Sequence, residues 1–111
     1  MTARRTPSAE LFMDRMNEIL NRIVEICGSD DGVTQIMLFG SRAKGTAMER
    51  SDIDIALIGQ DIDMEKLRDD VDRIDTLLKI DLVDFNGCKN EALKNEVSKD
   101  GVTIYGKTKS I

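Results

Sequence analysis

The stretch that most constrains the fold of this chain runs from residue 39 to residue 57 and reads FGSRAKGTAMERSDIDIAL. It places Gly40-Ser41 directly after an apolar run and, ten residues further on, Asp52-Ile53-Asp54 directly before another. Short apolar runs bounded by glycine and small polar residues are typical of buried strands. We therefore expect two strands joined by a glycine-bounded connection, with a pair of carboxylates at the start of the second strand.

Hydrophobic periodicity predicts the other elements of the chain. Thr6-Pro7 has the sequence of a helix N-cap followed by proline at the first helical position, and apolar residues at helical spacing continue to about Cys27. Asn86-Gly87 and Asp100-Gly101 end later elements. After this first helix we expect strands at 33–39 and 53–58, a helix at 63–78, a strand at 80–85, a helix at 90–99 and a strand at 102–105.

The length of 111 residues allows one domain with one hydrophobic core. We expect this domain to span residues 6–107, between flexible tails at 1–5 and 108–111. Such a chain has no room for a separate substrate domain, so a partner is expected to contribute much of the recognition. Charged residues make up 33% and apolar residues 41%, with no long apolar run and no signal-peptide pattern, so we expect a cytoplasmic protein without a membrane partner.

Composition excludes several classes of function. A net charge of -5 with no Trp and one Tyr disfavours nucleic acid as the main partner, because such a surface lacks a basic face and stacking rings. The absence of His removes the serine and cysteine triads and every imidazole zinc site. Catalysis would therefore use carboxylates, hydroxyls, cations and a metal. Cys27 and Cys88 have no CxxC spacing, and we interpret them as reduced thiols without a role.

The Gly-Ser pair has the chemistry of a phosphate-binding turn. Glycine has no side chain to keep a ligand away from the backbone, so Gly40 and Ser41 can present N–H groups to a phosphate, and Ser41 adds a hydroxyl. Arg42 and Lys44 supply positive charge within the same turn, and Gly45 lets the chain bend back toward the next strand. A Gly-Ser pair alone is most often only a turn.

The two carboxylates of Asp52 and Asp54 are expected to share one face of a strand. Side chains alternate in a strand, so both carboxylates leave on one side while Ile53 and Ile55 point into the core. Magnesium prefers hard oxygen ligands and commonly combines one or two carboxylates with the phosphates of a substrate. An isolated Asp-x-Asp more often simply starts a surface strand. Its combination with Gly40-Ser41 at this spacing favours metal-dependent chemistry on a nucleoside triphosphate.

A third carboxylate is expected from the strand at 80–85. If this strand neighbours the strand of Asp54, Asp81 can point toward the same metals. Asp84 competes for this role, but strand alternation places it on the opposite face, with Ile80 and Leu82. We therefore prefer Asp81 as the ligand and interpret Asp84 as a strand-end residue.

With these residues placed, the sequence resembles the minimal nucleotidyltransferases of the polymerase-beta superfamily. Their pattern is Gly-Ser, a spacer, Asp-x-Asp and a third Asp on a later strand, present here as FGSRAKG, SDIDIAL and IDLVDF over almost the whole chain. The resemblance implies the nucleotidyltransferase fold, of α/β (α+β) class, with a small mixed sheet flanked by helices. Lys44 stands where many relatives have arginine, a change that keeps the charge but loses the bidentate fork.

The resemblance also implies roles for individual residues. Gly40 and Ser41 would hold the triphosphate of ATP. Asp52, Asp54 and Asp81 would be the catalytic carboxylates and would bind Mg²⁺, with two ions expected. Two ions held in this way lower the pKa of an attacking hydroxyl and neutralise the departing pyrophosphate.

Small members of this superfamily are often paired with a separate helical HEPN protein as antitoxin and toxin. By similarity to these MntA-like antitoxins, the chain would transfer AMP from ATP to a tyrosine hydroxyl on a HEPN ribonuclease, in a hetero-oligomer. Two alternatives remain open at this point. The chain could be a catalytically silent nucleotide-binding module that neutralises its partner by binding, or it could transfer a nucleotide to a small molecule such as an aminoglycoside.

Overall fold

The structure of the protein is a computed structural model that describes residues 7–107, with side chains from residue 15 onward. Its elements follow in the order α1 (Pro7–Gly28), β1 (Val33–Phe39), α2 (Ser41–Lys44), β2 (Ile53–Gly59), α3 (Met64–Asp72), β3 (Ile80–Asp84), α4 (Glu91–Asp100) and β4 (Val102–Gly106). All predicted helices and strands are present, and α2 is an additional short helix. The predicted tails at 1–5 and 108–111 and the predicted N-cap at Thr6 lie outside the described residues.

The strands form one sheet of four strands in the order β3-β2-β1-β4. β1 is antiparallel to both of its neighbours, β2 and β4, whereas β2 and β3 are parallel. Parallel neighbours need a crossover connection, and α3 supplies it between β2 and β3. The sheet is therefore mixed, which confirms the predicted fold class.

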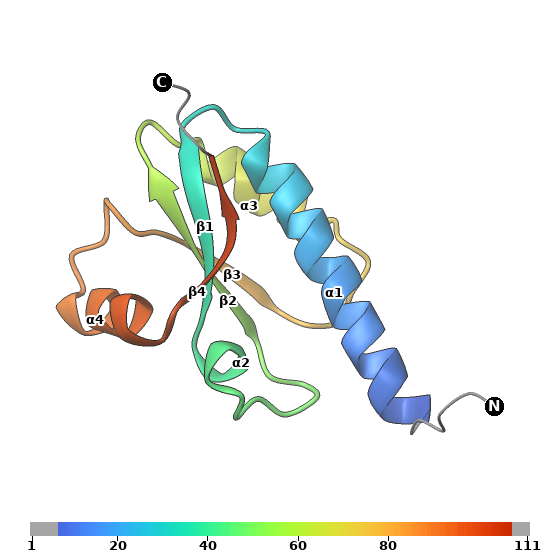
Figure 1. Cartoon of the computed structure of the whole chain (residues 1–111). Helices are drawn as coiled ribbons and strands as arrows, with labels where there is room; N and C mark the ends of the chain where they lie inside the picture. The colour runs from blue at the N-terminus through green and yellow to red at the C-terminus, as the bar shows by residue number, and fades with distance from the viewer. Residues whose placement is uncertain (1–6, 108–111) are drawn as a thin grey trace.

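Helices cover both faces of this sheet (Figure 1). On one face α1 and α3 pack over the larger core, and on the other face α4 packs over a smaller one. The larger core contains Ile19, Ile23 and Cys27 of α1, Leu67 and Val71 of α3, and Val33, Ile36, Ile53, Ile55, Leu57 and Leu82 of the strands. The smaller core contains Phe39, Ala56 and Val97, with Met37, Val83, Phe85 and Leu93 packed against it.

Helix α3 is shorter than the apolar spacing predicts. The prediction extended it to Leu78, but the helix ends at Asp72. The backbone N–H groups of the next two residues, Arg73 and Ile74, bond to carbonyls three residues back, and the Thr76 hydroxyl accepts a bond from the Leu78 N–H. A threonine that bonds to nearby backbone competes with the helix in this way. Ile74 and Leu78 still pack against the larger core, which explains why the spacing looked helical.

Both cysteines are free thiols, as expected. Cys27 is fully buried in α1, and this burial, with smaller contributions from the charges of Asp30 and Asp70, raises the pKa of its thiol to about 12. A thiol with so high a pKa stays protonated and unreactive near neutral pH. Among the described residues, the helices are all too short or too polar to cross a membrane.

Candidate functional site

The predicted site residues lie at one end of the sheet, where β1 ends and where β2 and β3 begin. Phe39, the last residue of β1, pairs with Asp54 across the antiparallel strands, and Asp54 pairs with Asp81 across the parallel strands. Gly40 and Ser41 follow directly in the chain. The structure therefore brings the Gly-Ser turn, the Asp-x-Asp pair and the third carboxylate together across three neighbouring strands.

The carboxylates of Asp54 and Asp81 share the face of the sheet that α4 covers. Ile53 and Ile55, on either side of Asp54, are fully buried in the core beneath α1 and α3. Leu82 packs into the same core from β3. Because side chains alternate across a strand, the two carboxylates point to the opposite face, as predicted. Asp52 stands exposed one residue before β2.

Position 40 requires glycine for two reasons, its backbone conformation and the atoms around it. Its φ is 75°, a conformation that residues with a side chain rarely adopt. A Cβ atom built at this position would also overlap the Oδ2 atom of Asp54. The glycine therefore lets the turn after β1 approach the carboxylate of β2 directly.

Backbone hydrogen bonds close the turn that follows Gly40. The N–H groups of Ala43 and Lys44 both donate to the Gly40 carbonyl at 3.1 Å. Gly45 ends α2 with a φ of 78°, and its N–H donates to the carbonyl of Ser41. This short helix was missed in the sequence because four residues show no periodicity, although the glycines at both of its ends were recognised as turn signals.

Like charges crowd around Asp54. Burial raises the pKa of this carboxyl, and the negative charges of Asp81, Asp52 and Glu96 raise it further, in that order, while Lys79 lowers it. Carboxylates that repel one another in this way are stabilised by a nearby cation. The charges of Asp52 and Asp81 thus act on Asp54, and we refer to these three residues as the acidic cluster. Their role as catalytic metal ligands stays a prediction.

Arg42 holds the connection between α2 and β2. Its guanidinium donates to the Ser51 carbonyl at 2.6 Å from Nη2 and at 3.2 Å from Nε, and Nη2 also bonds to the carbonyls of Met48 and Glu49. Burial lowers the pKa of Arg42, and the charge of Asp52 partly opposes this shift. These bonds make Arg42 a clamp on the loop. The sequence predicted it as a nucleotide-binding residue, and that role stays a prediction.

Two further residues at the site were not recognised from the sequence. Lys79 pairs with Asp81, with 3.6 Å between Nζ and Oδ1, and Glu96 pairs with Lys44 at the same separation. Lys79 could have been noticed, because it lies two residues before Asp81 in a nearly extended segment. Glu96 comes from a separate helix, and only the packing of α4 brings it to the site.

Asp84 takes the structural role that strand alternation indicates. Its Oδ1 atom accepts a hydrogen bond from the Gly87 N–H at 3.3 Å, across the Asn86-Gly87 turn. On the neighbouring strand Asp84 pairs with Leu57, three residues along the strands from the pair of Asp54 and Asp81. Asp84 is therefore a strand-end residue, in agreement with the prediction.

The donor set fits magnesium bound together with a substrate. Hard carboxylate oxygens are the ligands that Mg²⁺ prefers, and the cluster offers them at the sheet end. Among the side chains described from residue 15 onward, no three His, Cys, Asp or Glu residues are grouped so that they could hold a metal ion by themselves. An ion bound here would therefore need further ligands, such as phosphate oxygens and water.

Residues 21–110 match the family model described as polymerase beta, nucleotidyltransferase. No curated protein matches the chain. The family match includes every predicted site residue, from the Gly-Ser turn to the third carboxylate.

Several solved structures share the fold. A crystal structure of a toxin–antitoxin with AMP-PNP contains a chain that is 28% identical, with a TM-score of 0.61 and coverage of 79% of this chain and 73% of that one. A candidate nucleotidyltransferase from Sulfolobus solfataricus is 25% identical, with a TM-score of 0.58 and coverage of 96% and 94%. A tri-AMPylated Shewanella oneidensis HEPN toxin in complex with its MNT antitoxin contains a chain that is 24% identical, with a TM-score of 0.57 and coverage of 82% and 72%.

The last of these similarities shows the fold alone. The family model, in contrast, spans most of the chain and includes Asp52, Asp54 and Asp81. The chain therefore belongs to the polymerase beta nucleotidyltransferase family, is a nucleotidyltransferase, and is similar to chains of solved toxin–antitoxin structures that are 28% and 26% identical, the second of them an MntA-HpeT mutant.

Proposed function

We propose that this nucleotidyltransferase transfers AMP from ATP to a hydroxyl group on a partner protein, as the antitoxin of a HEPN ribonuclease toxin. The observation that supports it most is the row of Gly40, Asp54 and Asp81 across three strand ends. This row places a turn suited to phosphates beside carboxylates suited to magnesium. The same end of the sheet can thus hold both the donor nucleotide and its metal ions.

In this proposal Gly40 and Ser41 hold the triphosphate, and Lys44 adds a positive charge from the end of α2. Asp52, Asp54 and Asp81 would hold Mg²⁺, which when bound supplies charge neutralisation at the phosphates and a lower pKa for the attacking hydroxyl. The hydroxyl oxygen forms a bond to the α-phosphorus, and the bond from that phosphorus to the bridging oxygen breaks. Pyrophosphate leaves, and we assign Asp81 to accept the proton of the hydroxyl.

The nature of the acceptor is supported by the similar complexes. The relative at 28% identity is a toxin–antitoxin that was crystallised with AMP-PNP. In the Shewanella oneidensis complex the HEPN toxin is tri-AMPylated and the antitoxin is an MNT protein.

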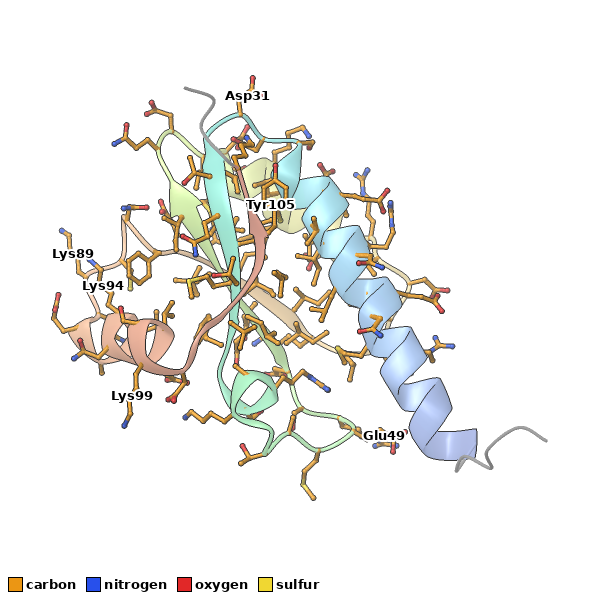
Figure 2. All side chains as sticks on the ribbon, viewed as in Figure 1. Asp31, Glu49, Lys89, Lys94, Lys99 and Tyr105 are labelled. Atoms are coloured by element: carbon orange, nitrogen blue, oxygen red, sulfur yellow. The ribbon has the colours of Figure 1, made fainter. Side chains whose placement is uncertain are left out.

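A transfer assay tests this proposal. The chain is incubated with Mg²⁺, ATP labelled at the α-phosphate and its candidate HEPN partner, and we expect label to appear on the partner. Asp54→Ala should abolish the transfer. Asp31→Asn is a matched control, because Asp31 is exposed at the opposite end of the sheet from the loop of Glu49 (Figure 2). Absence of label on the partner, or full labelling by Asp54→Ala, would contradict the proposal.

A triple variant separates transfer from simple binding. If the chain with Asp52, Asp54 and Asp81 all changed to Ala still neutralised the partner in cells, the silent binding module would be the better description. Label on an aminoglycoside in place of the partner would favour the small-molecule alternative.

A further inference from the structure

One ion pair joins the turn after β1 to helix α4. Lys44 Nζ lies 3.6 Å from Glu96 Oε2. Lys44 is the last residue of α2, the short helix that begins directly after Gly40, and Glu96 lies in the middle of α4. The pair therefore connects the turn proposed to bind phosphates with the helix that covers the same face of the sheet.

The position of Glu96 is fixed by the packing of α4. Val97, the next residue, is buried against Phe39 and Ala56, and Leu93, one turn earlier, packs against the same core. The Asn90 side chain caps the helix by accepting a hydrogen bond from the Leu93 N–H at 3.2 Å. Glu96 thus projects from a capped and packed helix, so its carboxylate stays near the site.

Glu96 places a negative charge beside the end of the turn that follows Gly40, because its carboxylate pairs with Lys44. A carboxylate at this place resembles a phosphate oxygen in charge, and both are ligands that a lysine ammonium binds. Glu96 and a bound triphosphate would therefore compete for Lys44.

The ion pair is accessible enough to exchange partners. The side chain of Lys44 is 43% exposed and that of Glu96 is 36% exposed. Ion pairs at this degree of exposure contribute little to stability, since water screens them. Breaking this pair costs little when a more highly charged ligand takes its place.

We propose that Glu96 binds Lys44 when no nucleotide is present, that the triphosphate displaces it, and that Glu96 thereby sets the affinity for the nucleotide. This inference rests on the proposed function, which supplies the triphosphate. It assigns Glu96 as a positioning residue that acts through Lys44. The consequence is that Lys44 exchanges the carboxylate of Glu96 for the triphosphate when the nucleotide binds.

The direct test is the affinity for ATP in the presence of Mg²⁺ and in the absence of any acceptor, measured by calorimetry. Glu96→Gln removes the charge but keeps the size and helix propensity of the side chain. We expect this variant to bind ATP about two- to five-fold more tightly than wild type, the range that corresponds to an exposed ion pair. Glu91→Gln is the matched control, because it removes the same charge from the exposed first turn of the same helix.

A double-mutant cycle tests whether Glu96 changes the affinity for ATP through Lys44. Lys44→Ala should weaken ATP binding, and in that background Glu96→Gln should no longer tighten it. Tightening that persists in full without Lys44, an unchanged affinity in Glu96→Gln, or equal tightening by Glu91→Gln would each overturn the proposal. Because no acceptor is present, these results are independent of AMP transfer to a partner. If wild type and all variants fail to bind ATP, the inference and the proposed function both fail.

Discussion

Gly40 and Asp54 lie so close together that a side chain at position 40 would occupy the place of the Asp54 carboxylate. They come from neighbouring antiparallel strands, Gly40 just past the end of β1 and Asp54 near the start of β2. The approach is possible only because position 40 has no Cβ atom and adopts a φ of 75°. Turn and carboxylate therefore form one structural unit.

Replacement of Gly40 tests this unit. Gly40→Ala should abolish nucleotidyl transfer and lower the free energy of unfolding, because the Cβ atom both displaces Asp54 and requires a strained φ. Gly45→Ala is a partial control. Gly45 also has a positive φ, of 78°, but its ψ of 14° is left-handed helical whereas Gly40 has a ψ of -156°, and a Cβ atom added at Gly45 would meet no neighbouring atom within 4 Å. It should cost only the backbone strain, on the order of 1–2 kcal/mol. Urea denaturation of both variants measures the difference, and equal losses would contradict the steric clash with Asp54.

The charge on Asp54 is expected to destabilise the folded protein in the absence of metal. Its pKa is raised, first by burial and then by neighbouring carboxylates, so folding favours the protonated form. The contribution of Asp54 to the free energy of unfolding is therefore most favourable below the ordinary aspartate pKa of 3.8 and is lost as the pH rises through the folded-state value. At pH 7 in metal-free buffer, Asp54→Asn should be more stable than wild type, and the difference should shrink as the pH falls toward 4.

Denaturant unfolding over this pH range measures the effect, and Asp31→Asn, far from the cluster, should show none of it. Addition of Mg²⁺ should then stabilise wild type more than Asp54→Asn, because a ligand that binds only the folded state raises its stability. A lower stability of Asp54→Asn at pH 7 without metal would show that the charge of Asp54 is compensated in the free protein.

Much of this arrangement was predictable from the sequence because it depends on local rules. Strand alternation has a period of two, so the faces of Asp54, Asp81 and Asp84 follow from the apolar residues around them. Glycine at position 40 marks a turn for a similar reason, since few other residues accept its backbone conformation. These rules do not depend on which elements meet in the folded chain.

The features that were missed depend on contacts between elements. The contact of Glu96 with Lys44 exists only because α4 packs over Phe39 and Ala56, and a sequence pattern does not specify that placement. The end of α3 is similar, because Ile74 and Leu78 follow a helical spacing but are buried by a non-helical segment. Tertiary packing therefore determines both features. Local periodicity gives no information on the contact of Glu96, and it predicts too long a helix for α3.

Arg42 is expected to act on the loop more than on the nucleotide. Arg42→Lys keeps the charge but removes the fork that binds the carbonyls of Met48, Glu49 and Ser51. We expect faster hydrogen exchange of the backbone amides at 46–51 and a lower rate of AMP transfer. Arg50→Lys, an exposed position in the same loop, should leave exchange unchanged. Unchanged exchange in Arg42→Lys, together with a large rise in KM for ATP, would instead make Arg42 a nucleotide ligand.

The choice between Asp81 and Asp84 can be settled with two variants of one strand. Both residues lie in β3, but Asp81 pairs with Asp54 at the acidic cluster, whereas Asp84 bonds to the Gly87 N–H. Asp81→Asn should lower AMP transfer by at least two orders of magnitude, the scale at which a general base contributes. Asp84→Asn keeps an Oδ1 acceptor for Gly87, so both transfer and stability should stay near wild type. The label-transfer assay with the HEPN partner measures transfer by the two variants, and denaturant unfolding measures their stability. A greater loss of transfer in Asp84→Asn than in Asp81→Asn would mean that the strand presents its other face to the substrate.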